Sequence, residues 1–257
     1  MGKSRAYMPA TYMFVRQKRG NRVEVLKWNR YIPRPFSHLF GDSKLTSIIS
    51  IKDELARDER LLGKIRNRLP ELFQIAEIES SRAGKVGMEV GSLRERVIVA
   101  MLIHKFGNQL VESEIPITEA EVDVKVRGVP ISIKTLTSRG FAGVKLIWTV
   151  DQENAIEFLR SYEPSCDMIF VQIAWENKGG FHYIPLSTQQ EVFREIGRDE
   201  YIKLPKQGTN PRGVEISGDA LKMLSRHEET LRIEIEWKKK DVGYNPIEKW
   251  LELWRRE

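Results

Sequence analysis

The spacing of apolar side chains divides the chain into a helical N-terminal part and a strand-rich remainder. Residues 12–31 predict two short strands joined in a hairpin, and residues 42–82 predict helices, the last of which opens at Pro70. Residues 83–91 contain three glycines and predict a flexible link. A strong amphipathic helix is expected next, over residues 92–106.

After this helix the apolar positions recur with the two-residue period of β-strands. Strands are expected at residues 109–113, 120–127, 130–136, 144–150, 167–176, 181–186, 214–217 and 231–237, and helices at residues 151–162, 187–197 and 219–227. This order predicts an α/β (α+β) fold, in which helices flank a mixed central β-sheet, with an N-terminal hairpin and a helical lobe. In the tail, Ile247, Trp250, Leu251 and Trp254 have helical spacing, which suits packing on the core or on a second subunit.

Basic side chains are concentrated near the N-terminus. The net charge is +6, and residues 1–35 carry nine Lys and Arg residues against the single acid Glu24, interleaved with aromatic side chains. This mixture suits contacts to phosphate groups, although a solvated basic face has the same composition. Cys166 is the lone cysteine and no apolar run reaches membrane-spanning length, so we expect a cytoplasmic protein that binds no membrane.

Candidate chemistry lies in residues 121–135, where one strand face is apolar and the other is polar. Asp123 and Lys125 alternate with valines, and Ser132 and Lys134 alternate with isoleucines. A two-residue turn at Gly128–Val129 would place Asp123 opposite Lys134. An exposed hairpin with a cross-strand ion pair has the same pattern. However, a hairpin in a core sheet would not normally leave one face charged, and an aspartate beside a lysine suits metal-assisted phosphodiester hydrolysis.

This hairpin resembles the active-site hairpin of the PD-(D/E)XK nuclease superfamily. In that superfamily an aspartate on one strand is followed across a turn by an acidic residue, any residue and a lysine. Asp123 matches the aspartate and Ser132-Ile133-Lys134 occupies the tripeptide, with Ser132 in place of the second acidic residue. The resemblance covers about residues 84–175. It implies a restriction-endonuclease-like fold. We expect a PD-(D/E)XK-like catalytic domain over residues 83–257, preceded by the basic hairpin and helices of residues 1–82 as a DNA-binding or dimerisation lobe, or one continuous domain.

The resemblance also implies a second acidic ligand, which must come from elsewhere than position 132. Many superfamily members carry a glutamate on the preceding helix, and Glu95 stands there, so Asp123, Glu95 and Ile133 are the expected metal contacts. Ser92 and Glu95 also form a capping-box pattern, and this alternative stays open. Glu121, two residues before Asp123 on the same face, is the other candidate, and Ser132 could contact a metal-bound water.

DNA contacts are expected around the hairpin and in a late polar loop. The superfamily's DNA side includes the loop after the lysine strand, although a solvated loop would look the same. Met88, in the glycine-rich link, suits either a wedge into the minor groove or burial beneath the helical lobe. The complete set of candidates is Met88, Lys125, Ser138, Arg139, Lys145, Lys206, Gln207, Asn210 and Arg212.

These features predict a type II restriction endonuclease. The resemblance implies Mg²⁺-dependent cleavage of double-stranded DNA at a short palindrome by a homodimer, with Asp123, Lys134, Glu95 and Ser132 as the catalytic residues. A structure-specific repair nuclease or resolvase of the same superfamily, and a DNA-binding protein without catalysis, are the alternatives. No phosphate-binding Gly-Lys-Ser/Thr loop is present, so no nucleotide cofactor is expected.

Overall fold

The computed structural model describes residues 18–19, 22–23, 49–82, 85–87, 89–116, 119, 121–147, 152–204 and 213–256. It contains two compact units, residues 1–48 and residues 49–257. In the first unit, β1 (Lys18–Arg19) and β2 (Arg22–Val23) pair antiparallel within the predicted hairpin. The remainder of the two predicted strands lies outside the described residues.

Two capped helices open the second unit. Ser50 caps α1 (Ile51–Ala56) and Asp58 caps α2 (Glu59–Ser80), each by accepting a backbone N–H bond with its side chain. The prediction that Pro70 opens a separate helix is wrong, because Pro70 lies inside α2 and is itself buried. Apolar packing of α2 therefore outweighs the backbone hydrogen bond that a proline removes.

A short hairpin lies at the start of the glycine-rich link. β3 (Ser81–Arg82) and β4 (Lys85–Val86) form a short antiparallel hairpin, and α3 (Val90–Phe106) begins soon after it. The expected boundary between residues 82 and 83 lies inside the second unit, because α2 packs on both α3 and the last strand of the sheet. The helical lobe of residues 49–82 is thus continuous with the sheet that it covers.

A six-stranded mixed sheet forms the centre of the second unit. Its strands, in spatial order, are β13 (Leu231–Trp237), β10 (Asn177–Ile184), β9 (Asp167–Ile173), β7 (Val129–Thr137), β6 (Val124–Val126) and β5 (Val111–Glu112), which follows a 3₁₀ turn at Asn108–Leu110. β7 and β9 are parallel and the other pairs are antiparallel. The predicted mixed central sheet is therefore confirmed. β10 begins four residues before its predicted start.

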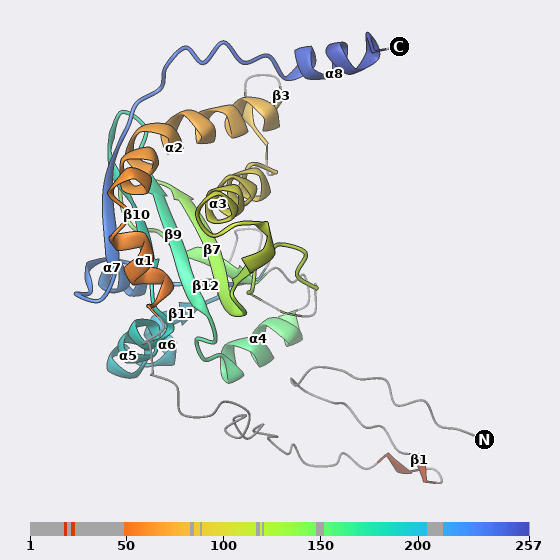
Figure 1. Cartoon of the computed structure of the whole chain (residues 1–257). Helices are drawn as coiled ribbons and strands as arrows, with labels where there is room; N and C mark the ends of the chain where they lie inside the picture. The colour runs from red at the N-terminus through yellow and green to blue at the C-terminus, as the bar shows by residue number, and fades with distance from the viewer. Residues whose placement is uncertain are drawn as a thin grey trace, which may run out of the picture. The chain divides into compact units, whose positions relative to one another are not determined.

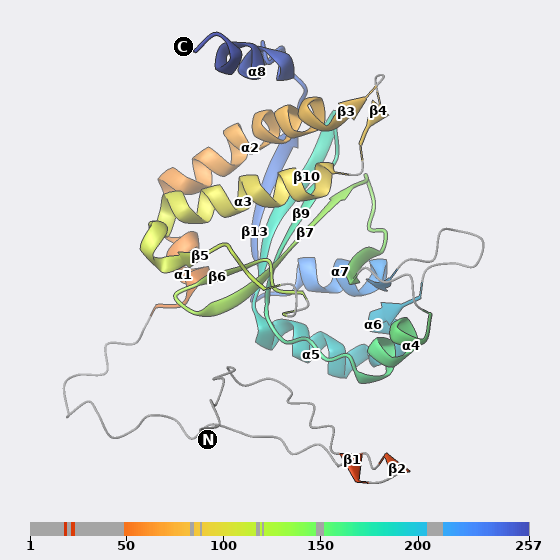
Figure 2. The same cartoon turned by 90° about the vertical axis from the view of Figure 1, so that its right-hand side faces the viewer.

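Helices lie on both sides of this sheet (Figure 2), and each face has its own hydrophobic core. α2 and α3 pack on one face, where Ile131, Ile133 and Ile169 are fully buried. On the other face lie a smaller sheet, β11 (Ile202–Lys203), β12 (Val214–Ile216) and β8 (Val144–Ile147), and four helices, α4 (Gln152–Ser161), α5 (Leu186–Ile196), α6 (Arg198–Tyr201) and α7 (Gly218–Arg226). Met168 and Phe170 of β9 point to this second core.

The tail forms the predicted helix α8 (Pro246–Trp254), which projects beyond α2 (Figure 1). None of its residues is buried, so the prediction that it packs on the core is wrong and the alternative of a second subunit remains. Among the described residues, the helices are too short or too polar to cross a membrane.

Candidate active site

Asp123 and Lys134 meet at the β6–β7 hairpin, but the turn differs from the prediction. The register places the two-residue turn at Arg127–Gly128 rather than at Gly128–Val129. Both turn residues have positive φ, 51° and 77°, as a type I′ turn requires. Lys134 consequently lies two residues beyond the position opposite Asp123. Because side chains alternate with a period of two, both residues keep the same face of the hairpin.

Three groups of β7 converge on one oxygen of Asp123. Its Oδ2 accepts a hydrogen bond from the Ile133 backbone N–H at 2.6 Å, and Ser132 Oγ and Lys134 Nζ each lie 3.4 Å from it. No hydrogen bond reaches Oδ1 from the described residues. The Ile133 side chain is fully buried and Ser132 is 2% exposed. β7 therefore holds the carboxylate in place and leaves one of its oxygens available.

Glu95 adds a second carboxylate to the site from α3. Burial and the nearby charge of Asp123 raise the pKa of Glu95, while Lys134 lowers it, so the three side chains act on one another electrostatically. The capping-box alternative is wrong because α3 begins at Val90, which places Ser92 inside the helix. Glu95 is half-buried and lies on the helix face toward the hairpin.

Glu121 is a further acidic neighbour, in a strained backbone conformation. Its φ is +71°, a region that residues other than glycine rarely occupy and that is often found at functional sites. Burial raises the pKa of Glu121 to about 7, opposed by Lys134 and by hydrogen bonds with Tyr162 and Ser165. The sequence named Glu121 as a candidate, but Tyr162 has no motif that could have revealed this contact.

The acidic residues of the site fit a divalent cation such as magnesium. Among the described residues, no group of three or more His, Cys, Asp or Glu side chains could hold a metal by itself. Mg²⁺ in phosphate-processing sites uses one or two carboxylates together with phosphate oxygens and water. Asp123, with its available Oδ1, and Glu95 supply such a pair. The donor set does not fit a zinc site, which needs nitrogen or sulfur ligands.

The loop that follows β7 is braced from the neighbouring strand. Gln172 on β9 donates from its amide to the carbonyl oxygens of Ser138 at 3.3 Å and Gly140 at 3.1 Å. Ser138 Oγ accepts the Gly140 N–H at 3.2 Å. Arg139, between them, is exposed. Gln172 was not predicted, since a polar residue on a buried strand has no sequence signal for the loop that it contacts.

The other predicted DNA contacts are dispersed. Lys125 forms an ion pair with Glu119 at 2.8 Å, and Lys145 pairs with Glu215 in the β8–β12 register. Both lysines are half-buried. The remaining candidates lie outside the described residues: Met88, Lys206, Gln207, Asn210 and Arg212.

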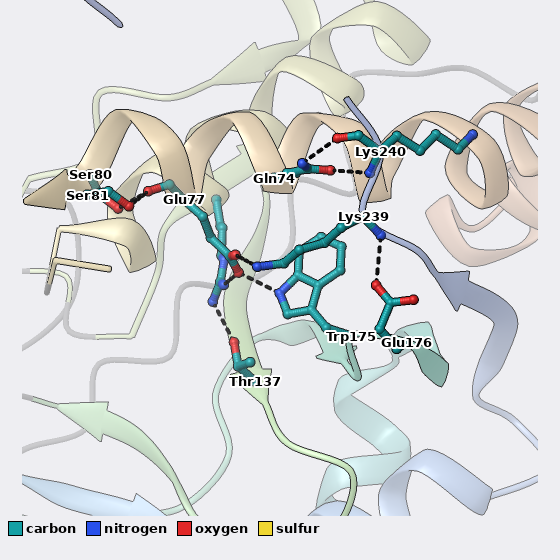
Figure 3. A network of polar contacts seen from close by, with 10 residues as sticks. Gln74, Glu77, Ser80, Ser81, Thr137, Trp175, Glu176, Lys239 and Lys240 are labelled. Atoms are coloured by element: carbon teal, nitrogen blue, oxygen red, sulfur yellow. Dashed lines mark hydrogen bonds and ion pairs between the residues drawn. The ribbon is translucent and has the colours of Figure 1, made fainter. Parts of the chain in front are cut away.

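A buried charge network joins α2, α3 and β7 (Figure 3). Glu77 accepts hydrogen bonds from Arg94 at 2.5 Å and Trp175 Nε1 at 2.7 Å, and Lys239 Nζ lies 3.4 Å away. Arg94 also donates to Thr137 Oγ1 at 3.0 Å, at the end of β7. The network fixes the helix residue next to Glu95. It was not predicted, because charged positions on amphipathic helices usually face solvent.

The mixed sheet and the Asp–Lys hairpin define a nuclease of the restriction-endonuclease-like class. The family model described as "Restriction endonuclease ThaI" matches residues 55–256, and the chain belongs to this family. A solved structure described as "Restriction endonuclease in complex with substrate DNA" is similar, with 59% identity, a TM-score of 0.73, and coverage of 78% of this chain and 97% of that chain. No curated protein matches the chain. The chain is thus a type II restriction endonuclease, a site-specific deoxyribonuclease, as predicted.

Proposed function

We propose that this restriction endonuclease cuts both strands of double-stranded DNA at a short palindrome, as a homodimer that requires Mg²⁺. The observation that carries the proposal is that Asp123 and Lys134 meet on the polar face of the β6–β7 hairpin, with Glu95 near enough for both charges to shift its pKa. The similar endonuclease, which was solved in complex with substrate DNA, supports DNA as the substrate of this chain. Two related sites on a two-fold dimer would reach both strands of a palindrome.

In this proposal Asp123 and Glu95 bind Mg²⁺, and Ile133 orients Asp123 through its backbone N–H. The bound ion supplies Lewis-acid activation of the scissile phosphate and lowers the pKa of water. Lys134 offsets the charge that develops on the phosphate and orients the attacking water. Ser132 donates to Asp123 Oδ2, which makes it a positioning residue for that carboxylate.

DNA would be held by the segments that flank this site. The exposed Arg139, on the loop that Gln172 braces, is proposed to contact phosphate or base edges together with Ser138 and Lys145. Lys125 lies on the same hairpin face as Asp123 and is proposed to contact the backbone near the cut. The lobe of residues 1–82, Met88 and the late loop with Lys206, Gln207, Asn210 and Arg212 are proposed as further DNA contacts.

The test compares Lys134→Ala with Lys178→Ala on plasmid and phage DNA. Lys178 is 65% exposed and forms a surface ion pair with Glu234, so its loss should leave cutting unchanged. Lys134→Ala should slow cleavage by about 10²–10⁴-fold. Discrete fragments that require Mg²⁺ and vanish with EDTA would support the proposal. A smear or junction-only cutting would contradict the palindrome, and intact DNA with a retarded band would contradict catalysis.

Metal binding gives a second readout that does not depend on turnover. Calorimetric titration of the DNA complex with Ca²⁺, which occupies oxygen sites, should show binding that Asp123→Asn and Glu95→Gln each weaken about tenfold or more. Glu121→Gln is the matched control, because Glu121 belongs to the same acidic neighbourhood but is not among the proposed ligands. If Asp123→Asn and Glu121→Gln weaken binding and Glu95→Gln does not, the second ligand is Glu121 rather than Glu95.

A further inference from the structure

The tail helix α8 has an apolar face that its own subunit does not cover. Ile247, Trp250, Leu251 and Trp254 follow helical spacing and fall on one face, and they are 65%, 52%, 39% and 87% exposed. A helix of 9 residues is marginal in water, because short helices gain most of their stability from packing an amphipathic face. A partner that covers this face would therefore stabilise α8.

The segment before α8 is attached to α2 by hydrogen bonds. Lys240 exchanges two hydrogen bonds with Gln74 of α2, at 2.6 and 2.9 Å, and Tyr244 donates to Glu79 near the end of the same helix. Asn245 then caps α8 through its side chain, which accepts the Ile247 N–H at 3.0 Å. The start of α8 is thus attached to the end of α2, and the helix extends away from there (Figure 1).

The charges of α8 favour a second copy of the same helix in the opposite direction. Glu248 lies near its N-terminal end and Arg255 near its C-terminal end, and both flank the apolar face on the same side, 3.8 Å apart at their closest atoms. In an antiparallel two-fold pair, each Glu248 meets Arg255 of the partner subunit, with Leu251 close to the axis. The opposed helix dipoles also favour this direction.

We propose that α8 is a dimerisation arm that packs antiparallel against α8 of a second copy of this chain. The proposal rests on the homodimer of the proposed function and names the contact that forms it. The basic N-terminal segment is a poorer occupant, because residues 246–256 carry three basic and two acidic side chains and would not attract it. Pairing of the two α8 helices adds to any other contact between the two subunits and keeps both catalytic sites on the same DNA molecule.

The experiment measures the dimer dissociation constant of the full chain by sedimentation equilibrium, for wild type, Leu251→Lys and the control Leu253→Lys. Leu253 is 43% exposed on the same helix but lies off the apolar face. Leu251→Lys should weaken the dimer about tenfold or more, whereas Leu253→Lys should change it less than about threefold. Glu248→Arg and Arg255→Glu should each weaken the dimer, and the two together should restore it, because the swap re-forms the pair between subunits.

Three results would contradict the proposal that α8 is a dimerisation arm. Equal dissociation constants for Leu251→Lys and wild type would exclude α8 as the contact and leave the homodimer in place. A wild-type chain that stays monomeric would remove the homodimer and the arm together. If removal of residues 1–48 red-shifts the tryptophan emission relative to a full-length Trp28→Phe reference while the dimer persists, the N-terminal segment covers α8 instead. As a functional readout, dilute Leu251→Lys should nick supercoiled plasmid under conditions in which wild type makes linear DNA.

Discussion

The buried ion pair between Glu77 and Arg94 should make the two single substitutions unequal in cost. The side chains are 8% and 6% exposed. Glu77→Leu leaves the Arg94 guanidinium in the core without its carboxylate and also removes the acceptor of the Trp175 indole N–H. Arg94→Met leaves Glu77 with two of its partners, Trp175 and the half-exposed Lys239. The glutamate therefore stays compensated when its partner is lost, and the arginine does not.

The magnitudes follow from these contacts. An uncompensated buried charge costs about 3–5 kcal/mol, so Glu77→Leu should lower the free energy of unfolding by about 4 kcal/mol. Arg94→Met, which leaves hydrogen bonds to Glu77 in place, should cost about 2 kcal/mol. Burial lowers the pKa of Arg94 and Glu77 raises it. Because the double substitution leaves no unpaired charge, it should cost less than Glu77→Leu alone.

Urea denaturation followed by circular dichroism measures all four proteins of this double-substitution cycle. The coupling between the two sites should exceed about 2 kcal/mol, with Glu77→Leu the least stable protein. Costs that simply add, or an Arg94→Met protein less stable than Glu77→Leu, would refute the reasoning. In that case solvent or relaxation of α3 must compensate Arg94 when its carboxylate is removed.

Two further predictions concern histidine ionisation and backbone conformation. Burial lowers the pKa of His182 to about 4. Between about pH 6.5 and 4 the histidine is therefore protonated in the unfolded chain but neutral in the folded chain. The free energy of unfolding should fall by about 3 kcal/mol as the pH drops through that window. The urea midpoint, plotted against pH, should lose this slope in His182→Gln and keep it in the exposed control His104→Gln. Equal slopes for the two variants would contradict the role of His182. Gly128→Ala should lower the free energy of unfolding by about 1–2 kcal/mol, because Gly128 has a φ of +77°. Gly63→Ala should raise it by about 0.5–1 kcal/mol, because Gly63 lies inside α2 and an added Cβ would meet no atom within 4 Å. Thermal melts that show the two variants to be equally stable would contradict the turn assignment.

Much of the candidate site was predictable from residues 121–135 alone. The alternation of valines and isoleucines with Asp123, Ser132 and Lys134 determined which face of the hairpin is polar, since side-chain direction follows from a period of two. The same alternation cannot determine register, and the turn at Arg127 and Gly128 moved the pairing by two residues. The error left the chemistry intact because it preserved the parity of the strand.

The glutamate of α3 shows where local pattern stops being informative. Ser92 and Glu95 had the spacing of a capping box, and only the earlier start of the helix at Val90 showed that Ser92 does not cap it. Its approach to Asp123 depends on how α3 crosses β7, which is a matter of packing between segments distant in sequence.

The sequence by itself determined the order of the central-sheet strands along the chain, the two-faced hairpin and the residues of the Asp–Lys pair, because each of these follows from the periods of helix and strand over a few neighbours. Only the tertiary structure decided that Pro70 continues a helix, that Glu77 and Arg94 are buried together, and that α8 finds no cover on its own subunit. Burial of a charge or an apolar face depends on contacts across long sequence separations. The spacing of residue types along a short segment does not specify those contacts.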